Sequence, residues 1–211
     1  MSPTLHAIVT TVGGILAGLA LAGAVLWRQH QALATARYEA THDEVTGLPN
    51  RRLFLTRLRA ALAGNTPVGV VLLDLNEFKT VNDTLGHDTG NDLLDQIGRL
   101  LTRIPAPVQV AARLSGDEFA LLVLGDRDDT AAAAHAAWEV IGAEPVRVVN
   151  GTLQVAASVG YSHIHASFAS PRQLLAQADA AMYEAKRTGS SVCEYLPHRT
   201  PTARSRDRHH Y

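Results

Sequence analysis

Three carboxylates in this sequence are placed where they could hold a divalent cation. Asp74 comes at the end of an apolar run, VVLLDL, which has the composition of a buried strand. Asp117 and Glu118 follow a Ser-Gly pair that is typical of a tight turn between strands. Magnesium prefers oxygen ligands and is usually held by one or two carboxylates together with substrate phosphates. If these strands are neighbours, the sequence predicts a metal site for phosphoryl transfer at one edge of a sheet.

Acidic residues also end strands as solvated caps, so the interpretation depends on the elements that position them. Hydrophobic periodicity and turn residues predict helices at 51–63, 78–85, 91–103, 130–141 and 171–187, and strands at 68–75, 108–113, 118–124, 146–149, 153–162 and 192–195. Asn150-Gly151 is expected to form a hairpin turn, and Gly189 to end the last helix. The order predicts an α+β fold, with one sheet and helices packed mainly on one of its faces.

Composition excludes several classes of function. The 211 residues are 46% hydrophobic and 18% charged, which is enough apolar material for a packed core. The net charge of −1 provides no global field for nucleic acid, so we expect no nucleic-acid partner and any polyanion must be bound by a local site. Because Cys193 is the single cysteine, an intramolecular disulfide and a thiolate metal cluster are both excluded.

The N-terminal region contains a long uncharged segment. Residues 7–27 read AIVTTVGGILAGLALAGAVLW, and about 20 such residues span a bilayer core of about 30 Å. We predict a transmembrane helix here. The alternative is a cleaved signal peptide, but no Lys or Arg precedes the segment and no small-residue cleavage site follows it. Basic residues occur only after the segment, starting at Arg28, so the positive-inside rule predicts a single-pass protein of the inner (cytoplasmic) membrane, with residues 1–6 outside and the domain in the cytoplasm.

A stripe of small residues lies within the same segment. Gly14, Gly18 and Ala22 would let two such helices approach closely, although the stripe is equally compatible with a helix that has no partner. Residues 28–42 lack Gly and Pro and contain good helix formers, so they are expected to continue as a helical stalk. The stalk would transmit pairing of the N-terminal helices to the domain that follows.

A series of motifs in this sequence resembles, in order and spacing, the motifs of the GGDEF diguanylate cyclase family. The motifs are DEVTGLPNRR at 43–52, LLDLNEFKTVNDTLGHDTGNDLL at 72–94, RLSGDEFALL at 113–122, ASVGYS at 157–162 and ADAAMYEAKRTG at 178–189. The resemblance covers about residues 41–196 and implies a palm-like domain at 43–196, with a central, mainly antiparallel sheet and flanking helices. The remaining segment, 197–211, is polar and basic and is expected to be disordered.

The resemblance also implies roles for the carboxylates. Asp74 and Asp117 would be ligands to Mg²⁺ or Mn²⁺, with the backbone carbonyl of Leu75 as a further ligand. Glu118 would assist at a second metal ion. In this family the residue at the position of Asp117 is also treated as the base for an attacking 3′-hydroxyl.

The substrate-binding residues are assigned by the same resemblance. Lys79 and Lys186 would lie against a triphosphate, since a lysine supplies a compact point charge. The turn formed by Ser115 and Gly116 would approach the phosphates. Without the motifs, either lysine would be interpreted as a solvated helix residue, and a lone histidine as a capping or packing residue. The positions that would contact guanine and its nucleoside are Asn82, His87 and Asn91.

The implied reaction condenses two molecules of GTP into cyclic di-GMP and releases pyrophosphate. Each domain would hold one GTP, so two half-sites must meet face to face and the active species would be a homodimer. The stripe and the stalk would then raise the effective concentration of one domain near the other. The alternative function is a catalytically degenerate GGDEF domain that binds GTP or a protein partner in signalling.

Two departures from the family pattern bear on this choice. The signature of the family is the sequence GGDEF, and here it is SGDEF at residues 115–119. Ser115 replaces the first glycine, which would permit positive φ and close approach of the substrate, so activity is expected to be impaired more than abolished. Asn91 stands where the family generally has Asp, and its amide cannot accept both donors of guanine, which could cost about 1 to 3 kcal/mol of binding energy. Asp92 follows in a helix about 100° away and is no simple substitute.

A third departure concerns product inhibition. The family often carries an RxxD inhibitory site shortly before the signature. The corresponding residues 106–109 are Ala, Pro, Val and Gln, which provide neither the arginine nor the aspartate. We therefore expect no inhibitory cyclic di-GMP site of the RxxD type.

Overall fold

The computed structural model describes residues 3–149, 151–164 and 170–197, except for the side chains of residues 4–17. The chain divides into two compact units, Met1–Thr41 and His42–Tyr211. The first unit contains helix α1, Pro3–Glu39, which includes residues 28–39 of the predicted stalk. The predicted tail at 197–211 and the turn residue Asn150 lie, apart from residue 197, outside the described residues.

The transmembrane prediction requires correction. Among the residues that the structure describes, no helix is long and apolar enough to cross a membrane. A membrane span needs about 20 predominantly apolar residues in one helix. The prediction of a transmembrane helix at 7–27 is therefore wrong, and so are the single-pass membrane location, the membrane as a partner and the outward N-terminus that were inferred from it.

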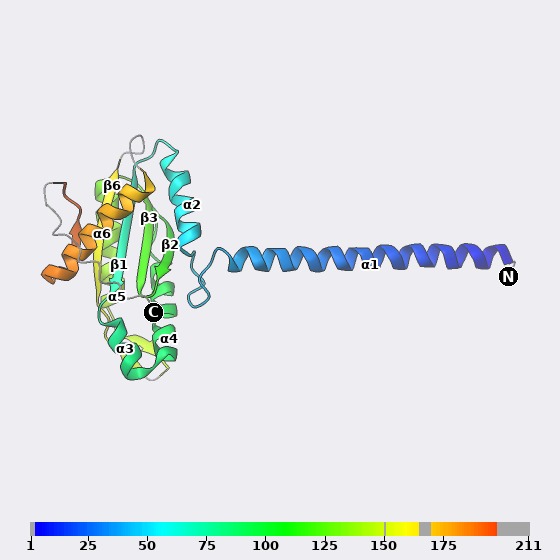
Figure 1. The fold of residues 1–211 in the computed structure, drawn as a ribbon, viewed down its shortest axis with the longest axis horizontal. Helices are drawn as coiled ribbons and strands as arrows, with labels where there is room; N and C mark the ends of the chain where they lie inside the picture. Colours follow the sequence, from blue (N-terminus) through cyan, green and yellow to red (C-terminus); the bar gives the residue numbers. More distant parts are fainter. Residues whose placement is uncertain (1–2, 150, 165–169, 198–211) are drawn as a thin grey trace. The chain divides into compact units, whose positions relative to one another are not determined.

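The second unit is built on a five-stranded sheet (Figure 1). The strands lie in the order β2-β3-β1-β6-β7, and all neighbours are antiparallel except β6 and β7, which are parallel. Their bounds are β1 Val68–Leu75, β2 Val108–Ser115, β3 Glu118–Leu124, β6 Ala157–Ile164 and β7 Val192–Glu194. The prediction of a palm-like α+β domain with a mainly antiparallel central sheet is confirmed, while the single parallel pair makes the sheet mixed.

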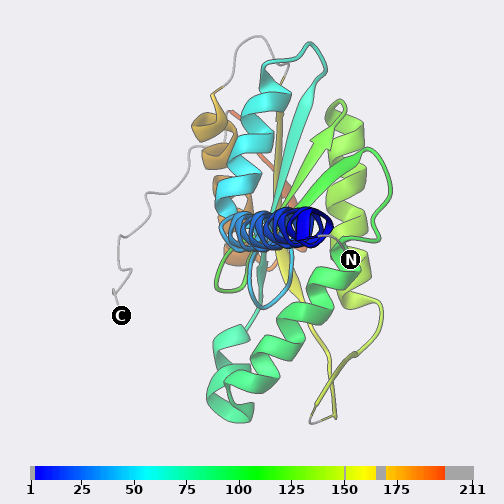
Figure 2. The same cartoon turned by 90° about the vertical axis from the view of Figure 1, so that its right-hand side faces the viewer.

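Helices cover both faces of this sheet, which differs from the predicted arrangement. On one face, Val71 and Leu73 of β1 pack with α4 (His87–Leu101) and α5 (Arg127–Gly142). On the other, Val70 and Leu72 pack with α2 (Arg51–Leu62) and α6 (Pro171–Thr188). Figure 2 shows α2 and α6 on one side of the strands and α5 on the other. This explains why β1 is a continuous apolar run, because both of its faces are buried.

Glycine allows α6 to lie directly on the sheet. A Cβ at Gly160 of β6 would collide with the backbone nitrogen of Met182 and would lie 2.5 Å from the carbonyl oxygen of Ala178. Because those atoms belong to the helix backbone, no side-chain rotation could make room. Gly160 therefore sets the distance between β6 and α6, and with it the position of the residues at the end of α6.

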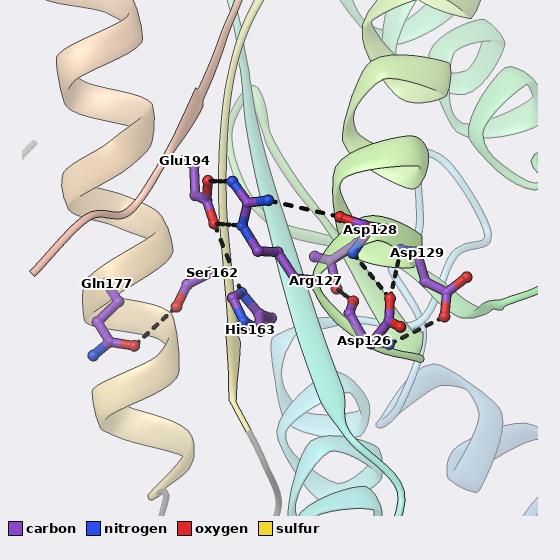
Figure 3. A network of polar contacts seen from close by, with 9 residues as sticks. Asp126, Arg127, Asp128, Asp129, Ser162, His163, Gln177 and Glu194 are labelled. Atoms are coloured by element: carbon purple, nitrogen blue, oxygen red, sulfur yellow. Dashed lines mark hydrogen bonds and ion pairs between the residues drawn. The ribbon is translucent and has the colours of Figure 1, made fainter.

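Polar contacts fix the edge of the sheet near β7 (Figure 3). Arg127, the first residue of α5, donates hydrogen bonds of 2.7 and 2.6 Å to the two carboxylate oxygens of Glu194 in β7. The α5 helix starts earlier than the predicted 130 because Asp126 forms a capping box with Asp129. Ser162 of β6 donates to the amide oxygen of Gln177 in α6 at 2.8 Å.

Two further boundaries differ from the prediction for local reasons. The predicted strand 153–162 is two strands, since β5 (Gly151–Leu153) pairs with β4 (Val146–Val148) in a separate small sheet before β6 begins. Helix α4 starts at His87, directly after α3 (Phe78–Leu85), because Gly86 has φ +86 and breaks the helix between them. Gly189 ends α6 with φ +70, as predicted.

Candidate active site

The structure brings the three predicted carboxylates to one end of the sheet. Asp74 and Glu118 are directly opposite each other in the antiparallel pair of β1 and β3. Asp117 lies in the turn that joins β2 to β3, and its backbone oxygen accepts a 3.3 Å hydrogen bond from the nitrogen of Leu75. Because side chains alternate along a strand, Asp74 shares a face with Leu72 and points toward the side of the sheet covered by α2 and α6.

The turn between β2 and β3, which contains Gly116 and Asp117, accommodates Ser115 without strain. Gly116 has φ +48, which is the left-handed conformation that favours glycine. Among the described residues, the only non-glycine residue with positive φ is Glu77, so Ser115 has an ordinary backbone conformation. The glycine that this turn needs for its conformation is thus the one that is retained, and the expected strain from Ser115 is absent.

Asp117 occupies an electrostatically unfavourable position for a carboxylate. Burial raises its pKa, and the nearby charges of Asp74 and Glu118 raise it further, while Lys186 acts in the opposite direction. The three acidic groups are therefore close enough to repel one another. A cation placed between Asp74 and Asp117 would relieve this repulsion.

A lysine already provides part of that positive charge. Lys186 near the end of α6 donates a 2.6 Å hydrogen bond to Oδ1 of Asp74, whose side chain is 15% exposed. The sequence predicted that Lys186 reaches a triphosphate, and the structure places its ammonium on the carboxylate that would carry the metal. Its side chain is 54% exposed, so the ammonium can exchange this partner for another anion.

The donor set fits magnesium only with help from substrate. Within the described residues, no group of three or more His, Cys, Asp or Glu side chains is arranged to hold a metal ion. Magnesium, however, commonly uses one or two carboxylates and completes its octahedron with phosphates and water. Asp74, Asp117 and the adjoining backbone at Leu75 satisfy that smaller requirement. The assignments of Asp74, Leu75, Asp117 and Glu118 as metal ligands stay predictions.

The predicted nucleoside contacts lie together on two consecutive helices. Asn82 belongs to α3, while His87 and Asn91 belong to the first turns of α4. The two helices approach closely because a Cβ at Gly90 would collide with the amide oxygen of Asn82. Asn91 directly follows Gly90 in α4, so it lies next to the point where the two helices meet. Whether that region binds guanine stays a prediction.

Asp92 of α4 and Lys79 of α3 differ in whether their charged groups are free to bind a ligand. Asp92 accepts a 2.7 Å hydrogen bond from the backbone nitrogen of Val149, so its carboxylate is occupied with the β4–β5 hairpin and cannot replace an aspartate at 91. Lys79, in the first turn of α3, is exposed, and no ion pair involves it in the part of the chain that the structure describes. It is therefore accessible to a phosphate.

Sequence reasoning missed an ion pair that supports the signature turn. Arg113 donates through Nη1 to Oδ1 of Asp43 at 2.8 Å and through Nε to the carbonyl oxygen of Gly116 at 2.9 Å. Burial raises the pKa of Asp43, but hydrogen bonds from Arg113 and Thr46 outweigh it and hold the pKa below its ordinary value. Asp43 and Arg113 both lie inside motifs that resemble the family's. Their place in those motifs was the one sign in the sequence that they could have a structural role.

We expect Asp43→Asn to destabilise the domain by about 1 to 3 kcal/mol, because it leaves a largely buried arginine without its charge partner. The side chains of Arg113 and Asp43 are only 12% and 22% exposed. The lowered pKa means that the contribution of Asp43 is present above pH 3.8 and is lost as the pH falls through its folded value. Urea unfolding of variant and parent should therefore differ at pH 7 and converge in acid.

The exposed pair Arg99–Asp95 supplies a matched control. Its arginine side chain is 65% exposed, so Asp95→Asn should change stability by less than about 0.5 kcal/mol. Equal effects of the two substitutions at pH 7 would contradict the structural role of Asp43.

Two surface clefts are lined in part by α2. A cleft of about 590 Å³ between α2 and α6 reaches the candidate site only at Glu118, and also contains Arg51, Arg59 and Arg172. A second cleft of about 590 Å³ lies along β2 and α2 and is lined mainly by apolar residues, together with Gln109 of the segment that corresponds to an RxxD site.

Comparison with known proteins identifies the family of this chain. The family model "Diguanylate cyclase, GGDEF domain" matches residues 40–191. Diguanylate cyclase TpbB of Pseudomonas aeruginosa is 35% identical over 161 residues, covering 73% of this chain and 37% of that protein. Cyclic di-GMP phosphodiesterase NbdA of the same species is 31% identical over 177 residues, covering 82% of this chain and 23% of that protein. The chain spans 20 to 48% of the length of the first curated relatives it matches.

The solved structures lead to the same family. The coiled coil and GGDEF domain of DgcB from Caulobacter crescentus, in complex with c-di-GMP, superimposes with a TM-score of 0.77 at 28% sequence identity. The match covers 85% of this chain and 98% of that one.

Proposed function

This chain belongs to the GGDEF domain family, and we propose from that premise that it is a diguanylate cyclase that condenses two GTP molecules into cyclic di-GMP and pyrophosphate. The observation that carries the proposal is the grouping of Asp74, Asp117 and Glu118 at one end of the sheet, with Lys186 in contact with Asp74. Two carboxylates beside a partly exposed ammonium suit a triphosphate with its divalent cation.

Asp74 and Asp117 would carry out the chemical step. A divalent cation held by Asp74 and Asp117 would supply Lewis-acid activation of the phosphates. The carboxylate of Asp117 would accept the proton of the attacking 3′-hydroxyl.

The lysines and the α3–α4 region would bind the nucleotide. Lys79 and Lys186 would stabilise negative charge on the triphosphate, and Lys186 would leave Asp74 to do so. The bases would be oriented by the side chains gathered on α3 and α4, namely Asn82, His87 and Asn91.

The reaction requires two chains, because each domain supplies one half-site. Helix α1 carries Leu19, Leu26 and Leu33 at intervals of seven residues, and these side chains are 65%, 65% and 50% exposed. Leucines with this spacing are typical of a coiled-coil seam. The structure of DgcB that resembles this chain also comprises a coiled coil and a GGDEF domain. We propose that α1 pairs with α1 of a second chain and raises the effective concentration of the two half-sites.

A second candidate function is a GGDEF domain that binds GTP and signals without making product. Asn91 favours this alternative, because it weakens the predicted contact with guanine.

The test is to incubate the purified chain with GTP and Mg²⁺ or Mn²⁺ and to measure both products by mass spectrometry. We expect two pyrophosphates for each cyclic di-GMP, a rate per chain that rises with protein concentration, and no product with a chelator. Saturable GTP binding without product at high protein concentration would instead support the second candidate.

Asn91→Asp is expected to tighten GTP binding by about tenfold or more, because a carboxylate accepts both donors of guanine through charge-assisted hydrogen bonds. Isothermal titration with a non-hydrolysable GTP analogue measures the gain, and the corresponding ATP analogue should gain nothing. Gln96→Glu, which adds the same charge to α4 at another position, is the control for general electrostatics. An equal gain for both nucleotides would remove Asn91 from the base site.

A further inference from the structure

The serine of the signature has a partner within the candidate site. Oγ of Ser115 donates a 2.9 Å hydrogen bond to Oε2 of Glu118. The two residues are paired across the end of β2 and β3, directly after an irregularity in the register between Arg113 and Ser115. This bond connects the residue that departs from the family pattern with one of the carboxylates that the pattern preserves.

The bond has a consequence for the orientation of Glu118. Its neighbours Asp74 and Asp117 are also acidic, so repulsion would turn an unrestrained glutamate side chain away from them. A long side chain also loses about 1 to 2 kcal/mol of conformational entropy when it is held in one position. A hydroxyl donor on Oε2 holds the carboxylate in place and leaves Oε1 available to a cation. A glycine at 115 offers no such donor.

We propose that Ser115 is a positioning residue whose hydroxyl holds the carboxylate of Glu118 for a second divalent cation, so that this signature uses serine as a functional replacement for glycine. The inference rests on the proposed function, because it assumes that Glu118 assists a metal ion. It does not require Ser115 to contact the substrate. The retained glycine, Gly116, already supplies the conformation that the turn needs.

Comparing serine, threonine, alanine and glycine at position 115 distinguishes this inference from an explanation based on the size of the side chain. If the hydroxyl is decisive, serine and threonine form one group, and alanine and glycine form another. If close approach of the substrate is decisive, the order follows size, with glycine best, then alanine, serine and threonine. The two explanations therefore rank Ser115→Gly and Ser115→Thr in opposite ways.

The experiment measures Mn²⁺ binding to the whole chain by electron paramagnetic resonance, in the presence of a non-hydrolysable GTP analogue. We expect Ser115→Ala and Ser115→Gly to weaken binding of the second Mn²⁺ by about three- to tenfold, as for one charge-assisted hydrogen bond. Ser115→Thr should stay within about twofold of the parent. In turnover, the metal concentration for half-saturation should rise while the rate at saturating metal changes less.

A double-mutant cycle with Glu118→Gln tests whether Ser115 acts through Glu118. When the chain already carries Glu118→Gln, replacing Ser115 by glycine should no longer weaken Mn²⁺ binding. Thermal unfolding without metal should be nearly the same for Ser115→Ala and Ser115→Thr as for the parent, because the residue is exposed. Ser115→Gly should lower it slightly, because glycine has more conformational entropy in the unfolded chain. Tighter Mn²⁺ binding by Ser115→Gly, or equal binding by all four residues, would overturn the inference.

The binding series also separates this inference from the proposed function. If no variant makes cyclic di-GMP but the hydroxyl-dependent order of Mn²⁺ binding persists, the cyclase proposal fails while the role of Ser115 stands. If product forms and the order follows size, the cyclase proposal stands and the role of Ser115 fails.

Discussion

Asp117→Asn is expected to reduce cyclic di-GMP formation at least about a thousandfold and, at the same time, to make the metal-free protein more stable. An asparagine cannot accept the proton of the 3′-hydroxyl, and it is a poorer ligand for a divalent cation than a carboxylate. The loss of a metal ligand and a base from one position removes several kcal/mol of transition-state stabilisation. The shape of the side chain is retained, so the domain should fold.

The gain in stability follows from the raised pKa of Asp117. Burial and the neighbouring charges of Asp74 and Glu118 raise this pKa above its ordinary value of 3.8. The folded state then binds the proton more tightly than the unfolded state, so stability falls as the pH rises from 3.8 through the folded pKa. Asparagine removes this penalty. The unfolding temperature of the variant should exceed that of the parent at pH 7, and the difference should shrink in acid.

Thermal unfolding in chelator and product formation in Mg²⁺ measure the two effects on the same preparations. The control is Asp95→Asn, the same change in the exposed ion pair of α4, which should leave both quantities nearly unchanged. A variant that retains normal turnover would exclude Asp117 as base and metal ligand. A variant that is less stable at pH 7 would show that its carboxylate is stabilised rather than strained in the folded protein.

Gly160→Ala is expected to cost about 3 kcal/mol or more, at the upper end of the range for overpacked cores. The added Cβ would meet backbone atoms of Met182 and Ala178, and backbone cannot rotate away as a side chain can. Helix α6 must therefore move away from β6. That movement would also separate Lys186 from Asp74, because the lysine lies on the same helix.

Urea unfolding measures the loss, with Gly142→Ala as the matched control. A Cβ at Gly142 meets nothing within 4 Å and its φ is not positive, so alanine there should be neutral or stabilise the protein by about 0.5 to 1 kcal/mol. A loss below about 1 kcal/mol for Gly160→Ala would mean that α6 is not held against the sheet as the structure shows.

The positions of most elements could be predicted because their causes are local. The apolar run that became β1 was recognised with its correct bounds, Val68–Leu75, and Gly189 was correctly placed at the end of α6. The errors also had local causes, since the capping box at Asp126 and the break at Gly86 determine where α5 and α4 begin. The split of the predicted strand 153–162 had another cause, because its two parts pair with different neighbours.

The N-terminal segment shows the limit of interpreting apolar composition. A run of uncharged residues predicted a transmembrane helix at 7–27, and α1 is helical there. No helix in the described part of the chain satisfies both the length and the apolarity that a membrane requires. Hydropathy records only which residues avoid water, and it does not specify what covers them.

The sequence by itself determined the family, the α+β class and the three carboxylates, because motif order and strand alternation are properties of neighbouring residues. Only the tertiary structure decided the partners of those carboxylates. Asp43 and Arg113 are 70 residues apart in the chain, and Asp74 and Lys186 are 112 apart. The bond from Ser115 to Glu118 is close in sequence, but it depends on the turn and register of β2 and β3. Such contacts depend on how folded elements pack, and no spacing along the chain specifies that packing.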